Sequence, residues 1–133
     1  MRRKYLLAFM FLPILMCNCK SMAVKSIQYS DQNNNHYSIT QTSLIYSPVT
    51  PEESSSGVYS GGDPAEVQLT KDEFNTILSL SEKIMKVSEG NEMKREMLTA
   101  VLVISEEGKS RKAILKRSEA RSALEELLQK VKQ

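Results

Sequence analysis

The chain has 133 residues, which is enough for one domain. Four basic and no acidic residues lie in the first 23 positions, so the rest carries 14 basic and 16 acidic side chains, a net charge of −2. The basic residues are interleaved with acidic ones rather than clustered, which argues against nucleic-acid binding. The chain has one histidine and no cysteine beyond position 19, which predicts no disulfide in the remainder of the chain, no metal site and no cofactor.

The first segment is typical of an export signal. Arg2, Arg3 and Lys4 precede an apolar run over residues 5–16. A helix of this length spans about 18 Å, whereas the hydrocarbon core of a bilayer is about 30 Å thick. We therefore predict a signal peptide over residues 1–18 rather than a transmembrane helix.

Two cysteines close this segment, where a bacterial lipoprotein carries its lipid anchor. Cys19 begins a Cys-Lys-Ser sequence that resembles the mature start of many bacterial lipoproteins, which implies palmitate-type lipidation of Cys19. Cys17 is the alternative anchor, with the signal ending at residue 16, although a bulky methionine precedes it. Ordinary cleavage after Ala23, with a signal over residues 1–23, is the third possibility.

A polar stretch follows, and we predict a tether over residues 19–36 and a folded domain over residues 37–133. Polar and apolar residues alternate over residues 26–30, so a short strand is possible there, paired with the next one through an Asn-rich turn. Residues 37–42 favour a strand because they include aromatic and β-branched side chains. Residues 47–64 are rich in proline, glycine and serine, and this composition predicts a long loop.

The next part of the chain predicts a strand over residues 65–69 and then a helix. Thr70 and Glu73 form a capping box, and the apolar residues behind it keep helical spacing for about seventeen residues. Gly90 is a suitable helix stop. These features predict one amphipathic helix between successive strands of the chain.

Residues 97–104 are apolar at successive positions, which predicts a central strand covered on both faces or nearly so. A turn and a partner strand over residues 110–115 follow, and Ser118 caps a last, leucine-rich helix. The order predicts an α+β domain. We expect one antiparallel sheet of about four to five strands, with two helices packed on one face.

No catalytic constellation is evident in the sequence. His36 is the only histidine, and as a general base it would need a nucleophile and an orienting acid brought to it by the fold. The serine at position 60 lies in a stretch like a nucleophile elbow, but Val58 stands where that motif needs glycine. We predict that the protein is not an enzyme.

The most unusual composition lies within the long loop. Small residues there allow the backbone to approach a partner closely, and Val58 and Tyr59 could anchor the contact. The alternative is a plain surface loop in which Tyr59 packs back on the sheet. We predict an interaction loop formed by Ser56, Gly57, Val58, Tyr59, Ser60, Gly61 and Gly62.

The order of elements resembles the emfourin-type proteinaceous inhibitors of metalloproteases. The matching pieces are Ser60-Gly61-Gly62, the helix start Leu69-Thr70 with Glu73, residues 99–115, and Leu124-Glu-Glu-Leu-Leu128. The Pro- and Ser-rich insertion before residue 60 departs from that family's compact pattern. The resemblance implies that residues 57–62 block a protease cleft.

Together these features predict a small, exported, non-enzymatic envelope protein that acts through binding. It would be held to a membrane by its N-terminal lipid and face the periplasm or the exterior, with a protein as its partner. The alternative is a protease inhibitor that acts through residues 54–62.

Overall fold

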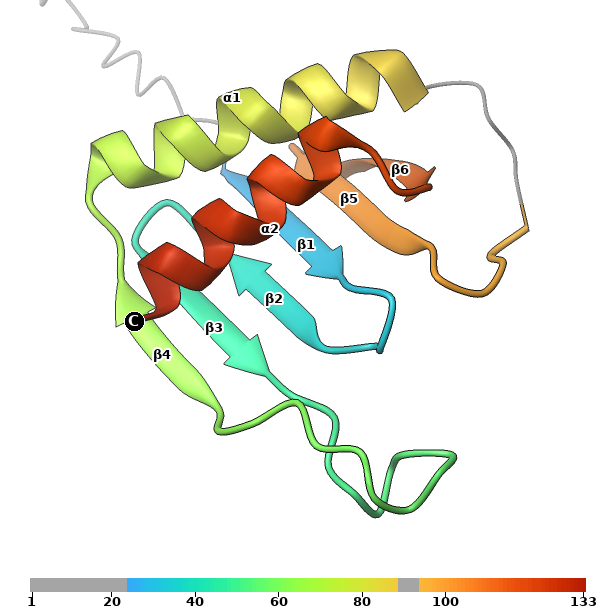
Figure 1. Cartoon of the computed structure of the whole chain (residues 1–133). Coiled ribbons are helices and arrows are strands. Elements are labelled where there is room, and N and C mark those ends of the chain that lie inside the picture. Colours follow the sequence, from blue (N-terminus) through green and yellow to red (C-terminus); the bar gives the residue numbers. More distant parts are fainter. Residues whose placement is uncertain (1–23, 89–93) are drawn as a thin grey trace, which may run out of the picture.

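Four strands form a meander, in which each strand pairs antiparallel with the next: β1 (Lys25–Ser30), β2 (His36–Ile39), β3 (Ser43–Ser47) and β4 (Ala65–Gln68). Helix α1 (Lys71–Ser88) then crosses one face of the sheet (Figure 1). The hairpin of β5 (Ala100–Glu106) and β6 (Lys109–Leu115) adds to the free side of β1, and α2 (Glu119–Lys132) ends the chain. This computed structural model describes residues 24–88 and 94–133.

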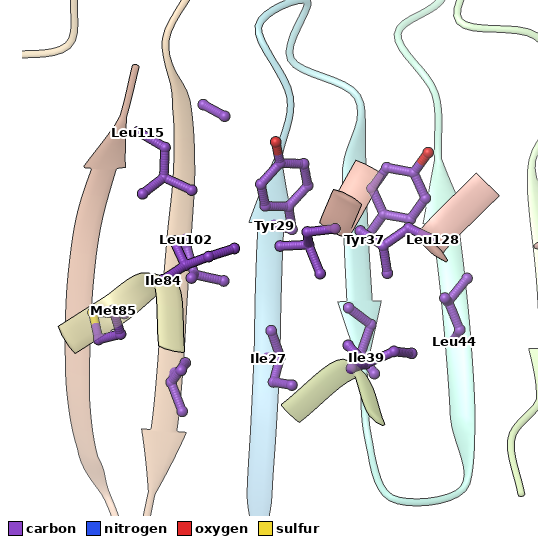
Figure 2. Close-up of a cluster of buried hydrophobic side chains, with 14 of the residues drawn as sticks. Ile27, Tyr29, Tyr37, Ile39, Leu44, Ile84, Met85, Leu102, Leu115 and Leu128 are labelled. Atoms are coloured by element: carbon purple, nitrogen blue, oxygen red, sulfur yellow. The ribbon is translucent and has the colours of Figure 1, made fainter. Parts of the chain in front are cut away.

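The six strands lie in the order β4-β3-β2-β1-β5-β6, and both helices cover the same face. The predicted α+β class is confirmed, with six strands rather than four to five. Alternate strand residues point to the helices, as Figure 2 shows for Ile27 and Tyr29 of β1 and for Leu102 of β5. They pack against Ile84 and Met85 of α1 and against Leu128 of α2.

Both helices begin where the sequence predicts. The Glu73 carboxylate accepts from the Thr70 amide at 2.8 Å, and the Glu73 amide donates to the Thr70 hydroxyl at 3.2 Å. The hydrogen bonds that the Glu73 carboxylate accepts from the Thr70 amide and hydroxyl lower the pKa of Glu73. The Ser118 hydroxyl accepts from the Arg121 amide at 3.1 Å and caps α2 in the same way.

The structure corrects the domain boundary and two strand assignments. Residues 25–30 lie within the sheet as β1, between β2 and β5, rather than in a tether. β3 was not predicted, because its five residues directly precede the Pro-rich loop and have no separate boundary signal. The second face of β5 is not covered by a helix, so Val101 and Val103 are only half-buried.

The signal peptide, Cys17, Cys19, Ala23 and the helix stop at Gly90 lie outside the described residues. Across residues 24–88 and 94–133, no helix is long and apolar enough to cross a membrane.

Candidate functional site

The strand directions bring four connecting segments to one end of the sheet, which we call the loop end. They are the β1–β2 turn (residues 31–35), the β3–β4 loop (48–64), the segment before β5 (94–99) and the β6–α2 junction (116–118). The register fixes this arrangement, because Ser30 pairs with both His36 and Val101, and His36 pairs with Ser47. β1 starts at the opposite end of the sheet (Figure 1), where its first residue, Lys25, pairs with Glu106.

Asn35 connects the turn to the long loop. The residue is 3% exposed, and its side-chain amide oxygen accepts from the Val49 N–H at 3.0 Å. Its amide nitrogen donates to the Tyr59 hydroxyl at 2.9 Å and to the Asp31 carboxylate at 2.8 Å. A single buried carboxamide therefore fixes two points of the loop, Val49 and Tyr59, on the turn.

Gly61 provides the third point of attachment. Its N–H donates to the Val49 carbonyl at 2.9 Å, and its own carbonyl accepts from the Tyr46 hydroxyl at 2.7 Å. A Cβ at this position would lie 2.0 Å from the Asn35 amide oxygen, so only glycine allows this close approach. The base of the loop is thus tied to β3 and to the turn.

The seven residues of the predicted interaction loop have different roles. Tyr59 and Gly61 belong to the base of the loop, so Tyr59 packs back and is not an exposed anchor. Val58 is 81% exposed and is presented at the surface. Ser56, Gly57, Ser60 and Gly62 are exposed beside it.

The serine content of the loop has a local explanation. The Ser56 hydroxyl accepts from the Tyr59 N–H at 3.3 Å and contacts the Ser54 hydroxyl at 2.9 Å. The Ser60 hydroxyl accepts from the Gly62 N–H at 3.2 Å. These hydroxyls hold the loop backbone in shape, and Val58 remains an exposed apolar group within the loop.

The loop end presents further apolar side chains in segment 94–99. Met97 is 91% exposed and Leu98 is 52% exposed. Arg95 in the same segment donates to the Asp31 carbonyl at 3.3 Å, which joins this segment to the β1–β2 turn. Exposed apolar groups thus stand in the two segments that flank the polar turn.

Arg121 of α2 connects this helix to segment 94–99. Arg121 is 3% exposed, and its guanidinium donates to the Leu98 carbonyl at 2.8 Å, to Glu125 at 2.9 Å and to the Gln32 side chain at 3.3 Å. Burial alone would lower the pKa of Arg121, but the hydrogen bond and charge of Glu125 outweigh it and raise the pKa. Arg121 is therefore a charged cross-link between helix, turn and segment.

Three tyrosines form a row beneath α2. Tyr29, Tyr37 and Tyr46 are direct neighbours on β1, β2 and β3, with ring centroids 6.2 Å and 4.7 Å apart. The Tyr29 hydroxyl donates to Glu125 at 2.5 Å, and the Tyr37 hydroxyl accepts from Gln129 at 2.9 Å. Because these helix residues are four apart, α2 follows the row across the strands.

Burial raises the pKa of all three tyrosine hydroxyls above their ordinary value of 10.0, and the Glu125 hydrogen bond adds to the effect at Tyr29. The hydroxyls therefore stay protonated near neutral pH. They serve as neutral hydrogen-bonding groups that hold α2 and the loop on the sheet. This arrangement gives the loop end a rigid base.

A cavity of about 460 Å³ lies beside the β1–β2 turn and the start of α2. Of its charged groups, Arg121 bonds Glu125 and Asp31 bonds the turn, while Arg117 is exposed at its rim. Within the described residues, no group of three or more His, Cys, Asp or Glu could hold a metal ion. The cavity can therefore accept a polar group of a partner, and it offers no evident reactive group.

His36 lies next to a serine hydroxyl, on the face of the sheet away from the helices. Its Nδ1 is 2.7 Å from the Ser30 Oγ, since these two residues are paired across β1 and β2. Among the described residues, no carboxylate is hydrogen-bonded to His36, so the orienting acid of a triad is missing. An exposed cross-strand hydrogen bond accounts for the contact.

Sequence reasoning missed Asn35 and Arg121. Arg121 occupies the apolar stripe of α2, three positions before Leu124 and seven before Leu128, and this spacing was an available signal of burial. Asn35 had no such signal, because it is one of three consecutive asparagines and only the tertiary fold selects it.

Comparison of the chain with protein-family models, with curated proteins and with solved structures finds no match. The resemblance to emfourin-type inhibitors therefore rests on the order of elements alone.

Proposed function

We propose that the protein is an exported, lipid-anchored, non-enzymatic envelope protein that binds a protein partner through its loop end. The observation that supports this most is the attachment of the long loop at Val49, Tyr59 and Gly61 while Val58 stays exposed. A loop of this length without such contacts would be mobile, and ordering it on binding would reduce affinity. Here the ordering is complete before a partner arrives.

The chemistry of the surface fits a protein partner. Val58, Met97 and Leu98 offer apolar contacts, and the turn between their segments carries amide and carboxylate groups. Apolar anchors beside polar groups are typical of protein interfaces.

The position of the loop end is consistent with a lipid anchor at Cys19. β1 begins at Lys25 and runs toward the loop end, and its six residues span about 20 Å. A membrane attached before Lys25 would lie at the opposite end of the sheet. The loop end would then face away from the membrane, toward soluble or envelope partners.

The proposed binding can be tested in the cells that make the protein. A photo-cross-linking amino acid at Val58 or Met97 of the full chain should give the same adduct, while one at Lys83, exposed on α1, should not. Val58→Asp should reduce the adduct formed from Met97. Adducts from all three positions, or from none, would contradict the proposal. Labelling with palmitate in Cys17→Ala and Cys19→Ala variants tests the anchor, which is refuted if the parent is unlabelled.

A protease inhibitor acting through residues 54–62 is the second candidate. The fixed base of the loop and the exposed Val58 favour it, because a rigid convex loop can enter a protease cleft and resist cleavage. Titration against secreted metalloproteases tests this function. Inhibition should be lost in Val58→Glu but kept in Val87→Glu, an equally exposed site on α1. Undiminished protease activity at micromolar excess of the wild-type chain would exclude it.

A further inference from the structure

The face of the sheet opposite the helices, which we call the open face, has an unusual composition for a surface in contact with water. Serines predominate among its side chains, with Ile45, Val101, Val103 and Ile114 between them. Glu66 and Lys112 are its only charged strand residues in the described chain. Water-facing sheet surfaces usually carry many long charged side chains, so this face is suited to being covered.

The two charged residues belong to one row that crosses all six strands. The pairing register joins directly opposite residues from β6 to β4, in the order Lys112, Val103, Gln28, Ser38, Ile45 and Glu66. The row therefore has a cation at one edge, an anion at the other, and one apolar residue on each side of a polar centre. Neither Lys112 nor Glu66 forms an ion pair within the described chain.

We propose that a second copy of this chain packs on the open face, about a two-fold axis that runs along the strands between β1 and β2. Such an axis reverses the row. Lys112 then faces Glu66 of the second copy, Val103 faces its Ile45, and Gln28 faces its Ser38. Charge meets opposite charge and apolar meets apolar, so the row is complementary to itself.

A shallow cavity of about 380 Å³ supports this arrangement. Val103, Gln28 and Lys112 line it, and the proposed axis places Ile45 of the second copy opposite Val103. Ile45 is 41% exposed, so it can project into that cavity. The small serine side chains around it allow two sheets to approach to about 10 Å.

The pattern of charge also excludes the other aligned packing. A two-fold axis perpendicular to the strands would bring Lys112 against Lys112 and Glu66 against Glu66, which is unfavourable. The axis along the strands keeps both Lys25 residues at one end and both loop ends at the other. Given the proposed lipid anchor, two copies could then share one membrane and present two binding surfaces side by side.

The available area is sufficient for a dimer. Six strands about 4.8 Å apart and three residue rows give a face of roughly 29 by 20 Å, or about 1,100 Å² buried over both copies. Specific interfaces begin near 1,000 Å², so the dimer is expected to be weak in solution and favoured at a membrane.

Carbodiimide cross-linking of the full chain in mild detergent tests the contact without any substitution. It should yield a Lys112–Glu66 amide in the dimer band. Within one copy this bond cannot form, because β6 and β4 are about 24 Å apart. The Lys25–Glu106 pair, 3.3 Å apart in one copy, is the positive control. A Lys25–Glu106 product without a Lys112–Glu66 product would overturn the proposal.

Charge reversal tests the symmetry. In sedimentation equilibrium, Lys112→Glu and Glu66→Lys should each weaken dimerisation at least about tenfold, because each reversal acts twice in a symmetric dimer. The double variant, and an equal mixture of the two single variants, should restore it, whereas Lys83→Glu on α1 should change nothing. A monomer at about 100 µM, or single variants that are not rescued, would refute the proposed dimer.

Discussion

The carboxamide of Asn35 occupies the space that a side chain at position 61 would need. Gly61 therefore lies close enough for its N–H to bond Val49 and its carbonyl to bond Tyr46, while Asn35 bonds Val49 and Tyr59. Residues 26 positions apart thus form one joint at the base of the loop.

We expect Gly61→Ala to open this joint. The added methyl group would displace Asn35, and the free energy of unfolding should fall by about 2–3 kcal/mol. Urea denaturation measures the loss, and proteolysis within residues 48–64 should become faster. Ser60→Ala, which removes only a hydroxyl bond to Gly62, is the control and should cost less than about 1 kcal/mol.

The coupling between the two positions can be measured directly. Asn35→Ala removes the group that Gly61→Ala would strike, so the double variant should lose less stability than the sum of the single losses. Strict additivity would show that the two residues do not share a contact.

Arg121→Met should destabilise the protein by about 3 kcal/mol, because it leaves Glu125 and the Leu98 carbonyl without their buried partner. Arg121→Lys should keep only part of the stability, since an ammonium cannot reach three acceptors in the same fork. Arg117→Met, an exposed neighbour, should change the unfolding free energy by less than about 0.5 kcal/mol. Equal effects at positions 117 and 121 would contradict the cross-linking role.

Leu98 has a φ of 67°, a conformation that β-carbons disfavour by about 1–2 kcal/mol. Leu98→Gly should relieve this strain, while the greater flexibility of glycine in the unfolded chain should offset part of the gain. We expect the free energy of unfolding to rise by about 0.5–1 kcal/mol in total. Thermal unfolding can detect this change. A clear loss of stability would mean that the half-exposed leucine side chain contributes more than the strain costs.

Stability should fall at alkaline pH. Burial raises the folded-state pKa of Tyr29, Tyr37 and Tyr46, so below pH 10 both states hold these protons and stability is unaffected. Above pH 10 the unfolded chain releases them first, and each tyrosine should lower the unfolding free energy by about 1.4 kcal/mol per pH unit until its folded pKa is reached.

Urea denaturation between pH 8 and 11.5 measures this slope. Tyr37→Phe removes one buried hydroxyl, so the fall in unfolding free energy above pH 10 should be smaller by about 1.4 kcal/mol per pH unit. A stability that stays constant up to pH 11 would show that the hydroxyls are more accessible than the structure places them.

The candidate site was only partly predictable. Composition identified the 56–62 segment as unusual and left open whether Tyr59 packs back; the structure shows its hydroxyl bonded to Asn35 of the β1–β2 turn. Composition could not identify Asn35 or Arg121, because a polar side chain can be buried only where the fold brings hydrogen-bond partners to it from distant segments. Arg121 reaches a carbonyl 23 positions earlier in the chain.

Features that depend on neighbouring residues could be derived from the amino-acid sequence. The Thr70–Glu73 and Ser118 caps, the helical stripes and the alternation of β4 follow from local hydrogen bonding and from fixed residue spacing. The tertiary structure alone decided that β1 lies between β2 and β5, that four segments meet at the loop end, and that Lys112 and Glu66 share one row. Strand pairing joins residues far apart in the chain, and its register is set by burial of a whole face rather than by any local pattern.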